Sequence, residues 1–161
     1  MTWDEFVSNV RAWSTERGIY EHSTAVAQAL KACSEAGELC DAVIKGDRAA
    51  LIDSIGDICV CLVNTCHMLG DDSIRPPVNP WFDKSLIHNA GSVSLRCSQL
   101  AIDIEYGDVD SALSSASDAY FYLVSICIVE CFDILECCES AWNEIKDRKG
   151  RMVAGGAFVK D

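Results

Sequence analysis

One apolar segment constrains the fold of this chain more than any other. Residues 48–69 are apolar on nearly every face of an expected helix, yet Asp53, Asp57 and Asn64 interrupt them at spacings of i, i+4 and i+11. Because each residue of an α-helix advances by about 100°, these three polar side chains share one narrow stripe. Such a helix is expected to be buried, and carboxylates on it need a partner.

The preceding segment, residues 25–44, is also expected to be a helix with a polar stripe. Four of its side chains fall within roughly 80° of one another: Gln28, Lys31, Glu35 and Glu38. Lys45-Gly46-Asp47 supplies a C-terminal glycine followed by a new N-cap. A connection this short makes the two helices antiparallel neighbours, so the two polar stripes are expected to face each other.

The whole chain is expected to form one all-α domain, residues 1–161, as an antiparallel bundle of five to six helices. Half of the residues are hydrophobic, and Gly and Pro contribute only 10 and 3 residues, a composition typical of a compact helical protein. Site helices at about 25–69 precede a proline-rich connector at 70–83, C-terminal helices at 84–149 and a tail at 150–161. The expected helices are 3–17, 25–44, 48–69, 84–106, 109–129 and 134–148, with a loop at 18–24. No strand shows clear period-two alternation, although the glycine-broken tail can form a short extended piece.

Charge and cysteine content exclude several classes of function. The net charge of -12 argues against nucleic-acid binding through a basic surface. The ten cysteines follow no apparent secretory signal and lie mostly in apolar helical patterns, so we expect a cytoplasmic protein that uses them as small hydrophobic residues. Residues 51–69 contain too many polar side chains for a membrane span. Cys59, Cys61, Cys66 and His67 lack the paired spacing of a zinc site.

The densely apolar segment 109–129 suggests a helical partner, most simply a second copy of the chain. The assembly is expected to be a homodimer or homotetramer that completes the core.

The facing carboxylates have the chemistry of a magnesium site. Mg²⁺ takes oxygen ligands and commonly binds a few carboxylates together with a substrate phosphate. The expected ligands are Glu35, Glu38, Asp53 and Asp57, and Lys31 lies one turn before Glu35, where it can reach a phosphate oxygen. The alternative is a solvated helix edge with i, i+4 ion pairs.

The same residues resemble a known family. Lys31-x-x-x-Glu35-x-Gly37-Glu38-Leu39, followed by Ile55-Gly56-Asp57 and Asn64, is similar to the MazG-like members of the all-α nucleoside triphosphate pyrophosphatases, whose signature is ExxE, a spacer and ExxD. The flanks Trp13-Ser-Thr-Glu-Arg-Gly-Ile19 and Ile145-Lys-Asp-Arg-Lys-Gly-Arg-Met152 also resemble phage and bacterial MazG-like proteins. Residues 70–110 are the least similar.

This resemblance implies hydrolysis of a nucleoside triphosphate to its monophosphate and pyrophosphate, with Mg²⁺ as cofactor and Mn²⁺ as a possible substitute. Glu35 or Glu38 would act as the base on the attacking water. The remaining expected contacts to substrate come from Gln28, Lys31, Asn64, Arg148, Lys149 and Lys160. The location would be the cytoplasm, or the host cytoplasm for a phage-encoded chain.

Two serines depart from the family signature. Ser34 stands where many relatives carry the first of two consecutive glutamates, and Ser54 stands where ExxD places its glutamate. Asp53, one helical turn from Asp57, can compensate for Ser54. The alternative function is therefore a helical regulator that keeps the fold with weak or no activity. A di-iron bundle is disfavoured, because none of the three histidines follows a Glu by three residues.

Overall fold

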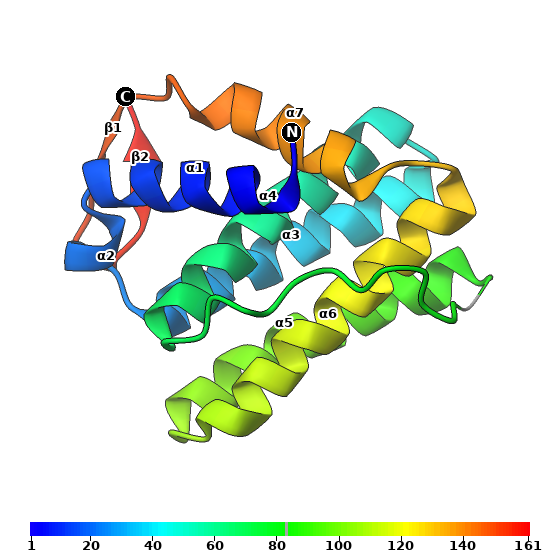
Figure 1. Cartoon of the computed structure of the whole chain (residues 1–161), viewed down its shortest axis with the longest axis horizontal. Helices are drawn as coiled ribbons and strands as arrows, with labels where there is room; N and C mark the ends of the chain where they lie inside the picture. The colour runs from blue at the N-terminus through cyan, green and yellow to red at the C-terminus, as the bar shows by residue number, and fades with distance from the viewer. Residues whose placement is uncertain (83) are drawn as a thin grey trace.

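The computed structural model describes residues 1–82 and 84–161 and shows an all-α protein (Figure 1). Its described part contains seven helices and one small β-hairpin. The helices are α1 (Trp3–Glu16), α2 (Ile19–His22), α3 (Ala25–Lys45), α4 (Arg48–Met68), α5 (Leu86–Glu105), α6 (Val109–Glu130) and α7 (Ile134–Ile145). The hairpin pairs β1 (Gly150–Met152) antiparallel with β2 (Phe158–Lys160).

The pair α3 and α4 forms the centre of the bundle (Figure 1). Helices α5 and α6 pack together on one side of this pair, where α5 lies against α3. Helices α1 and α7 lie on the other side and contact α4. The C-terminal hairpin lies at the same end of the bundle as α2.

Local capping explains why α3 and α4 begin and end where they do. The Thr24 side chain caps α3 by accepting from the backbone N–H of Ala27 at 3.1 Å. Gly46 ends α3 with a φ of 64°, and Asp47 then caps α4. Within this short turn the chain reverses, so the predicted antiparallel pairing of the two helices is confirmed by the 3.3 Å hydrogen bond from Asn64 Nδ2 to Gln28 Oε1.

Helix α4 is the most buried helix, and a glycine lets α7 approach it closely. A Cβ atom on Gly56 would lie 2.5 Å from the Cys137 carbonyl oxygen and 2.6 Å from the Ala141 Cβ. Only the absence of a side chain at position 56 allows this packing. As a result, the C-terminal turns of α7 lie beside the polar stripe of α4.

The structure corrects several sequence-based boundaries. The described part has seven helices rather than five or six, because the expected loop at 18–24 contains the short helix α2. The last helix ends at Ile145 rather than 148, and the tail forms a β-hairpin between residues 150 and 160. Helix α5 begins at Leu86, two residues after the expected start. Of the predicted connector 70–83, residue 83 lies outside the described residues.

Most of the apolar surface of α6 is buried against other helices of the same chain. The apolar pattern of residues 109–129 is therefore explained without the partner that was expected to cover it. Its small and apolar residues are buried against neighbouring helices: Ala112, Ala116, Ala119, Tyr120, Leu123, Val124 and Cys127. By length and composition alone, α4 and α6 could each cross a membrane. However, 72% and 56% of their most apolar stretches are buried inside the bundle, as in core helices. The ten cysteines are free thiols, most of them buried.

Candidate functional site

A cavity of about 300 Å³ lies between α3, α4, α7 and the C-terminal hairpin. Side chains from α1 and α2 close the end of the cavity at which Gln28 and Asn64 lie. The residues that line it are Trp13, Ile19, Ala27, Gln28, Leu30, Lys31, Glu35, Asp57, Val60, Cys61, Asn64, Ile145, Arg148 and Gly155 to Phe158. Five of the residues singled out from the sequence line this cavity together with Arg148, so the fold brings most of the predicted site into one place.

The polar stripes of α3 and α4 meet along a line that we call the α3/α4 seam. Gln28 faces Asn64 at its inner end, and Glu35 faces Asp57 further along. Glu38 and Asp53 lie at its outer end, where the charge of Glu38 acts on Asp53. The predicted facing arrangement is therefore confirmed, and the seam runs from amides at one end to carboxylates at the other.

Lys31 and Glu35 form an ion pair one helical turn apart within the cavity. Partial burial by itself lowers the pKa of Lys31, but the hydrogen bond and charge of Glu35 raise that pKa overall. The Glu35 side chain is only 6% exposed, whereas that of Lys31 is 57% exposed. Lys31 therefore remains charged and can swing toward a ligand, while Glu35 is fixed.

Asp57 is the most perturbed carboxylate of the seam. Burial, followed by the charges of Glu35, Asp53 and Glu144, raises the pKa of Asp57 to about 7, although Arg148 acts in the opposite direction. Neighbouring carboxylates disfavour one another's ionised forms, and a cation removes that penalty. The electrostatics of this end therefore favour a bound cation or proton.

The outer end of the seam includes a carboxylate that sequence reasoning did not identify. Glu144, on α7, lies beside Asp53, and burial and then the charge and hydrogen bond of Glu144 raise the pKa of Asp53. Glu144 also forms an ion pair with Arg148. Ser54 is 4% exposed and packed in the core. Glu144 of α7 therefore lies near Ser54, the position at which the MazG-like signature has a glutamate and this chain has a serine.

Hydrogen bonds fix the orientation of Asn64 at the inner end of the seam. Its Oδ1 atom accepts from Ser14 Oγ at 2.7 Å and from the Tyr20 hydroxyl at 2.8 Å. Because hydroxyl donors occupy this oxygen, Nδ2 is turned toward Gln28 Oε1. Gln28 Nε2 donates in turn to Ser23 Oγ at 3.0 Å. Burial raises the pKa of Tyr20 to about 12, so its hydroxyl stays a donor.

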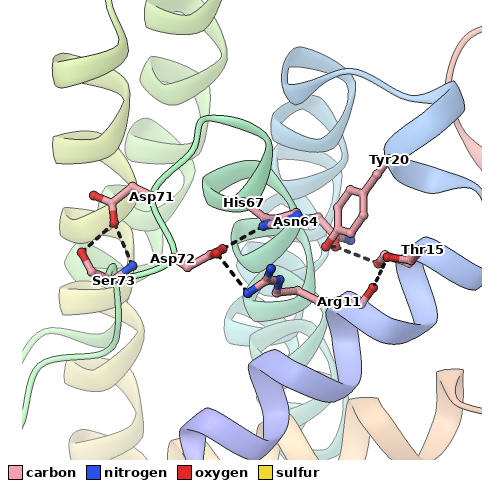
Figure 2. A network of polar contacts seen from close by, with 9 residues as sticks. Arg11, Thr15, Tyr20, Asn64, His67, Asp71, Asp72 and Ser73 are labelled. Atoms are coloured by element: carbon pink, nitrogen blue, oxygen red, sulfur yellow. Dashed lines mark hydrogen bonds and ion pairs between the residues drawn. The ribbon is translucent and has the colours of Figure 1, made fainter.

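A second polar network lies next to Asn64, between α1, α2 and the C-terminal end of α4 (Figure 2). Asp72, just after α4, forms an ion pair with Arg11 of α1 at 3.0 Å and contacts His67 Nδ1 at 2.9 Å. The ring of His67 packs against Tyr20, with centroids 4.6 Å apart. Figure 2 shows Tyr20 reaching from this network to Asn64. The start of the connector therefore braces the amide end of the cavity.

The structure separates the predicted basic residues into two groups. Arg148 lines the cavity beside Asp57. Lys149 and Lys160 are exposed and do not line it, since both lie at the open end of the β1–β2 hairpin. Their expected contact with a phosphate tail remains a prediction, whereas Arg148 already occupies a suitable position.

The donor set fits a hard cation that shares its coordination with a substrate. Within residues 1–82 and 84–161, no three His, Cys, Asp or Glu side chains are arranged to hold an ion by themselves. Glu35 is engaged by Lys31, and Glu38 is exposed outside the cavity. Mg²⁺, however, is commonly held by one or two carboxylates plus substrate phosphates. Glu35 and Asp57 meet that requirement in the cavity, with Asp53 and Glu144 adjoining.

Several aromatic and apolar residues of the cavity were not predicted to take part in the site. Trp13, named above only in a flank that resembles MazG-like proteins, lines the cavity and packs edge-on against Phe158, with ring centroids 5.5 Å apart. Phe158 reaches the cavity because the tail folds back as a hairpin. The i, i+4 spacing of Glu144 and Arg148 is a sequence signal that could have placed Glu144 beside the site.

Comparisons with known proteins give one partial relative. Over 70 residues the chain is 37% identical to an uncharacterized 18.2 kDa protein from the rep–hol intergenic region of Haemophilus phage HP1. The match covers 44% of this chain and 43% of the phage protein, so it spans less than half of either. No family model matches the sequence. No solved structure matches it either.

Proposed function

We propose that this protein is a Mg²⁺-dependent nucleoside triphosphate pyrophosphohydrolase, a hydrolase that cleaves an NTP or dNTP to the monophosphate and pyrophosphate. The observation that carries the proposal is the cavity in which Lys31, Glu35, Asp57 and Arg148 gather at one end, opposite an amide and aromatic end. A nucleotide has the same polarity, with a polyanion at one end and a flat, hydrogen-bonding base at the other. The resemblance of the motifs around Glu35 and Asp57 to MazG-like proteins supports the same conclusion.

At the charged end, each side chain has a distinct role in this proposal. Lys31 moves from Glu35 to a phosphate oxygen, since its exposed ammonium group is free to turn. Released from the ion pair, Glu35 accepts the proton of the attacking water as a general base. Arg148 binds the pyrophosphate portion through its guanidinium group. Mg²⁺, when bound, neutralises triphosphate charge and acidifies the nucleophile.

At the other end, the cavity presents a base-sized apolar wall with fixed amides. Trp13 and Phe158 offer aromatic surface against which a nucleobase can pack. The Asn64 amide is held by Ser14 and Tyr20, so it offers the same donor orientation to every ligand. Fixed amides of this kind position a substrate with little loss of conformational entropy.

The direct test is pyrophosphate release from purified protein incubated with each canonical NTP and dNTP, with Mg²⁺ and with a chelator. We expect release with at least one nucleotide, and only when Mg²⁺ is present. A matched thermal-shift measurement uses Mg²⁺ with a non-hydrolysable triphosphate analogue. Absence of both product and thermal shift across the whole nucleotide panel would sink the proposal.

A second candidate is a regulatory or interaction protein that keeps the bundle with little or no activity. Ser54 favours it, because the side chain at this position is buried and carries no carboxylate. In this case the cavity binds nucleotide without turnover. Thermal stabilisation by Mg²⁺ and nucleotide with no pyrophosphate release would identify this second function.

A further inference from the structure

A buried hydrogen-bond donor in the wall of the candidate cavity lacks a partner among the described residues. Trp13 is 7% exposed and lines the cavity. Within residues 1–82 and 84–161, its indole Nε1–H group donates to no acceptor. Burial of an N–H group without a hydrogen bond carries a free-energy cost, so each such group in a folded protein calls for an explanation. At the wall of a cavity, the explanation is an acceptor that a ligand brings.

The Asn64 amide supplies a second donor at the same end of the cavity. Ser14 follows Trp13 in α1 and donates to Asn64 Oδ1, as the Tyr20 hydroxyl does, so both lone pairs of that oxygen are used. The Nδ2 group carries two hydrogens. In the described part of the chain it donates to Gln28 Oε1 and to no other acceptor. The second hydrogen of Nδ2 is therefore available to a ligand beside Trp13.

These two donors differ in how well they match the polar groups of a nucleobase. A carbonyl oxygen has two lone pairs and can accept from two N–H groups at once. An unprotonated ring nitrogen accepts from one N–H group, and an amino group only donates. The best complement of Trp13 and Asn64 is therefore an exocyclic carbonyl oxygen.

The orientation of Phe158 makes this contact compatible with stacking of the base. The ring planes of Trp13 and Phe158 meet at 69°, with centroids 5.5 Å apart. A flat base that packs parallel to Phe158 is thus steeply inclined to the indole and can present its edge, rather than its face, to the Nε1–H group. A single pose then uses the aromatic surface of Phe158 and the donor of Trp13.

We infer that Trp13 selects the nucleobase by donating from Nε1 to an exocyclic carbonyl oxygen. The protein then prefers nucleotides of cytosine, uracil, thymine or guanine to those of adenine, which has an amino group and ring nitrogens but no carbonyl oxygen. With adenine the buried donors stay unpaired, and a site built to hydrogen-bond a ligand discriminates strongly against one that lacks the matching group. This inference rests on the proposed nucleotide function and adds the class of base to it.

Nuclear magnetic resonance of the full chain labelled with nitrogen-15 tests the contact directly. The four tryptophans give four indole N–H signals. Trp3→Phe, Trp81→Phe and Trp142→Phe assign the Trp13 signal by elimination, so the measurement on the parent does not depend on a Trp13 variant. The probes are deoxynucleoside triphosphates with a methylene bridge between the α and β phosphates, added with Mg²⁺. With a carbonyl-bearing base at saturation, we expect the Trp13 indole proton to shift downfield and to exchange more slowly with water.

Dissociation constants of the same probes test the selectivity. The adenine analogue should bind at least about 10-fold more weakly than the tightest carbonyl-bearing analogue. Trp13→Phe keeps an aromatic ring but removes the donor, so it should weaken the tightest analogue by on the order of 10-fold and narrow the preference. The matched control is Trp81→Phe, which removes an indole N–H from a residue that is 77% exposed and outside the cavity. It should change neither constant.

The inference and the proposed function fail in distinguishable ways. A probe that binds at saturation without changing the Trp13 signal overturns the inference alone, as does tightest binding of the adenine analogue. Binding with the expected Trp13 shift but no pyrophosphate release from the matching natural triphosphate supports the inference and contradicts the enzymatic activity. No binding of any analogue overturns both.

Discussion

Glu144 on α7 lies beside Asp53 on α4, and the charge of Glu144 acts directly on that carboxylate. Partial burial and the adjacent Glu144 charge raise the pKa of Asp53, and the same charge helps to raise that of Asp57. Gly56 makes this possible by letting α7 pack directly on α4. Three helices therefore contribute carboxylates to one end of the α3/α4 seam, and a cation is the simplest means of relieving their repulsion.

Glu35→Gln is expected to lower turnover much more than Glu38→Gln. Glu35 is buried in the cavity beside Asp57, whereas Glu38 is exposed at the outer end of the seam. Removal of a general base costs on the order of 10²–10⁴-fold in rate. Steady-state pyrophosphate release from both variants gives the comparison, with helical content as the control. Equal losses would mean that both glutamates act directly on the reaction.

Asp53→Asn tests whether a neighbouring residue replaces the glutamate that is missing at Ser54. If Asp53 supplies a ligand, the Mg²⁺ concentration for half-maximal activity rises by on the order of 10–100-fold. The matched variant is Glu144→Gln, which removes the adjacent charge from α7. We expect a smaller effect for it, because Glu144 is already paired with Arg148. An unchanged Mg²⁺ requirement in Asp53→Asn would show that Asp53 is not a ligand.

The raised pKa of Asp57 predicts a pH dependence of stability in the metal-free protein. Between the ordinary value of 3.8 and about 7, folded Asp57 keeps a proton that the unfolded chain releases. Stability from this group therefore falls as pH rises through that window, by at most about 4 kcal/mol. The Asp57→Asn variant cannot ionise at this position and avoids the loss.

Urea unfolding of both proteins in the presence of a chelator measures this effect. The free energy of unfolding of Asp57→Asn minus that of the parent should increase from acidic pH to pH values above about 7. Titrating groups outside the seam are common to the two proteins and cancel in the difference. A difference that stays constant across this range would contradict the raised pKa.

The Asn64 network predicts unequal costs for removing its members. Asn64→Ala leaves the hydroxyls of Ser14 and Tyr20 and the Gln28 carbonyl without their partner, so we expect a loss of about 2–4 kcal/mol in unfolding free energy. Tyr20→Phe removes one donor and leaves Ser14 on Asn64, for a loss of about 1 kcal/mol. Denaturant unfolding checks both values. Similar losses in the two variants would show that the amide is not the centre of the network.

Sequence periodicity was sufficient to place the six longer helices and to predict that α3 and α4 pair. The polar stripes, Gly46 and Asp47 predicted that α3 and α4 lie antiparallel with Glu35 facing Asp57, and the structure confirms it. These features are local, because caps and a 3.6-residue repeat depend on nearby residues alone.

Contacts between distant segments were not predictable in the same way. Neither Glu144 beside Asp53 nor Phe158 beside Trp13 follows from local pattern, because each depends on how α7 and the hairpin pack. The apolar repeat of α6 likewise could not distinguish a face buried within the chain from one that binds a partner.

Gly56→Ala is expected to destabilise the fold, in contrast to Gly37→Ala. The new methyl group at position 56 would lie 2.5 Å from the Cys137 carbonyl oxygen, and α7 would have to move away from α4 at a cost of about 1–3 kcal/mol. At position 37 a Cβ meets nothing within 4 Å, so alanine should add about 0.5–1 kcal/mol through its higher helix propensity. Urea unfolding of both variants measures these changes. A movement of α7 also shifts Glu144 and Arg148, so Gly56→Ala should weaken Mg²⁺ binding while Gly37→Ala leaves it unchanged. Equal stability of the two variants would contradict the close packing of α7 on α4.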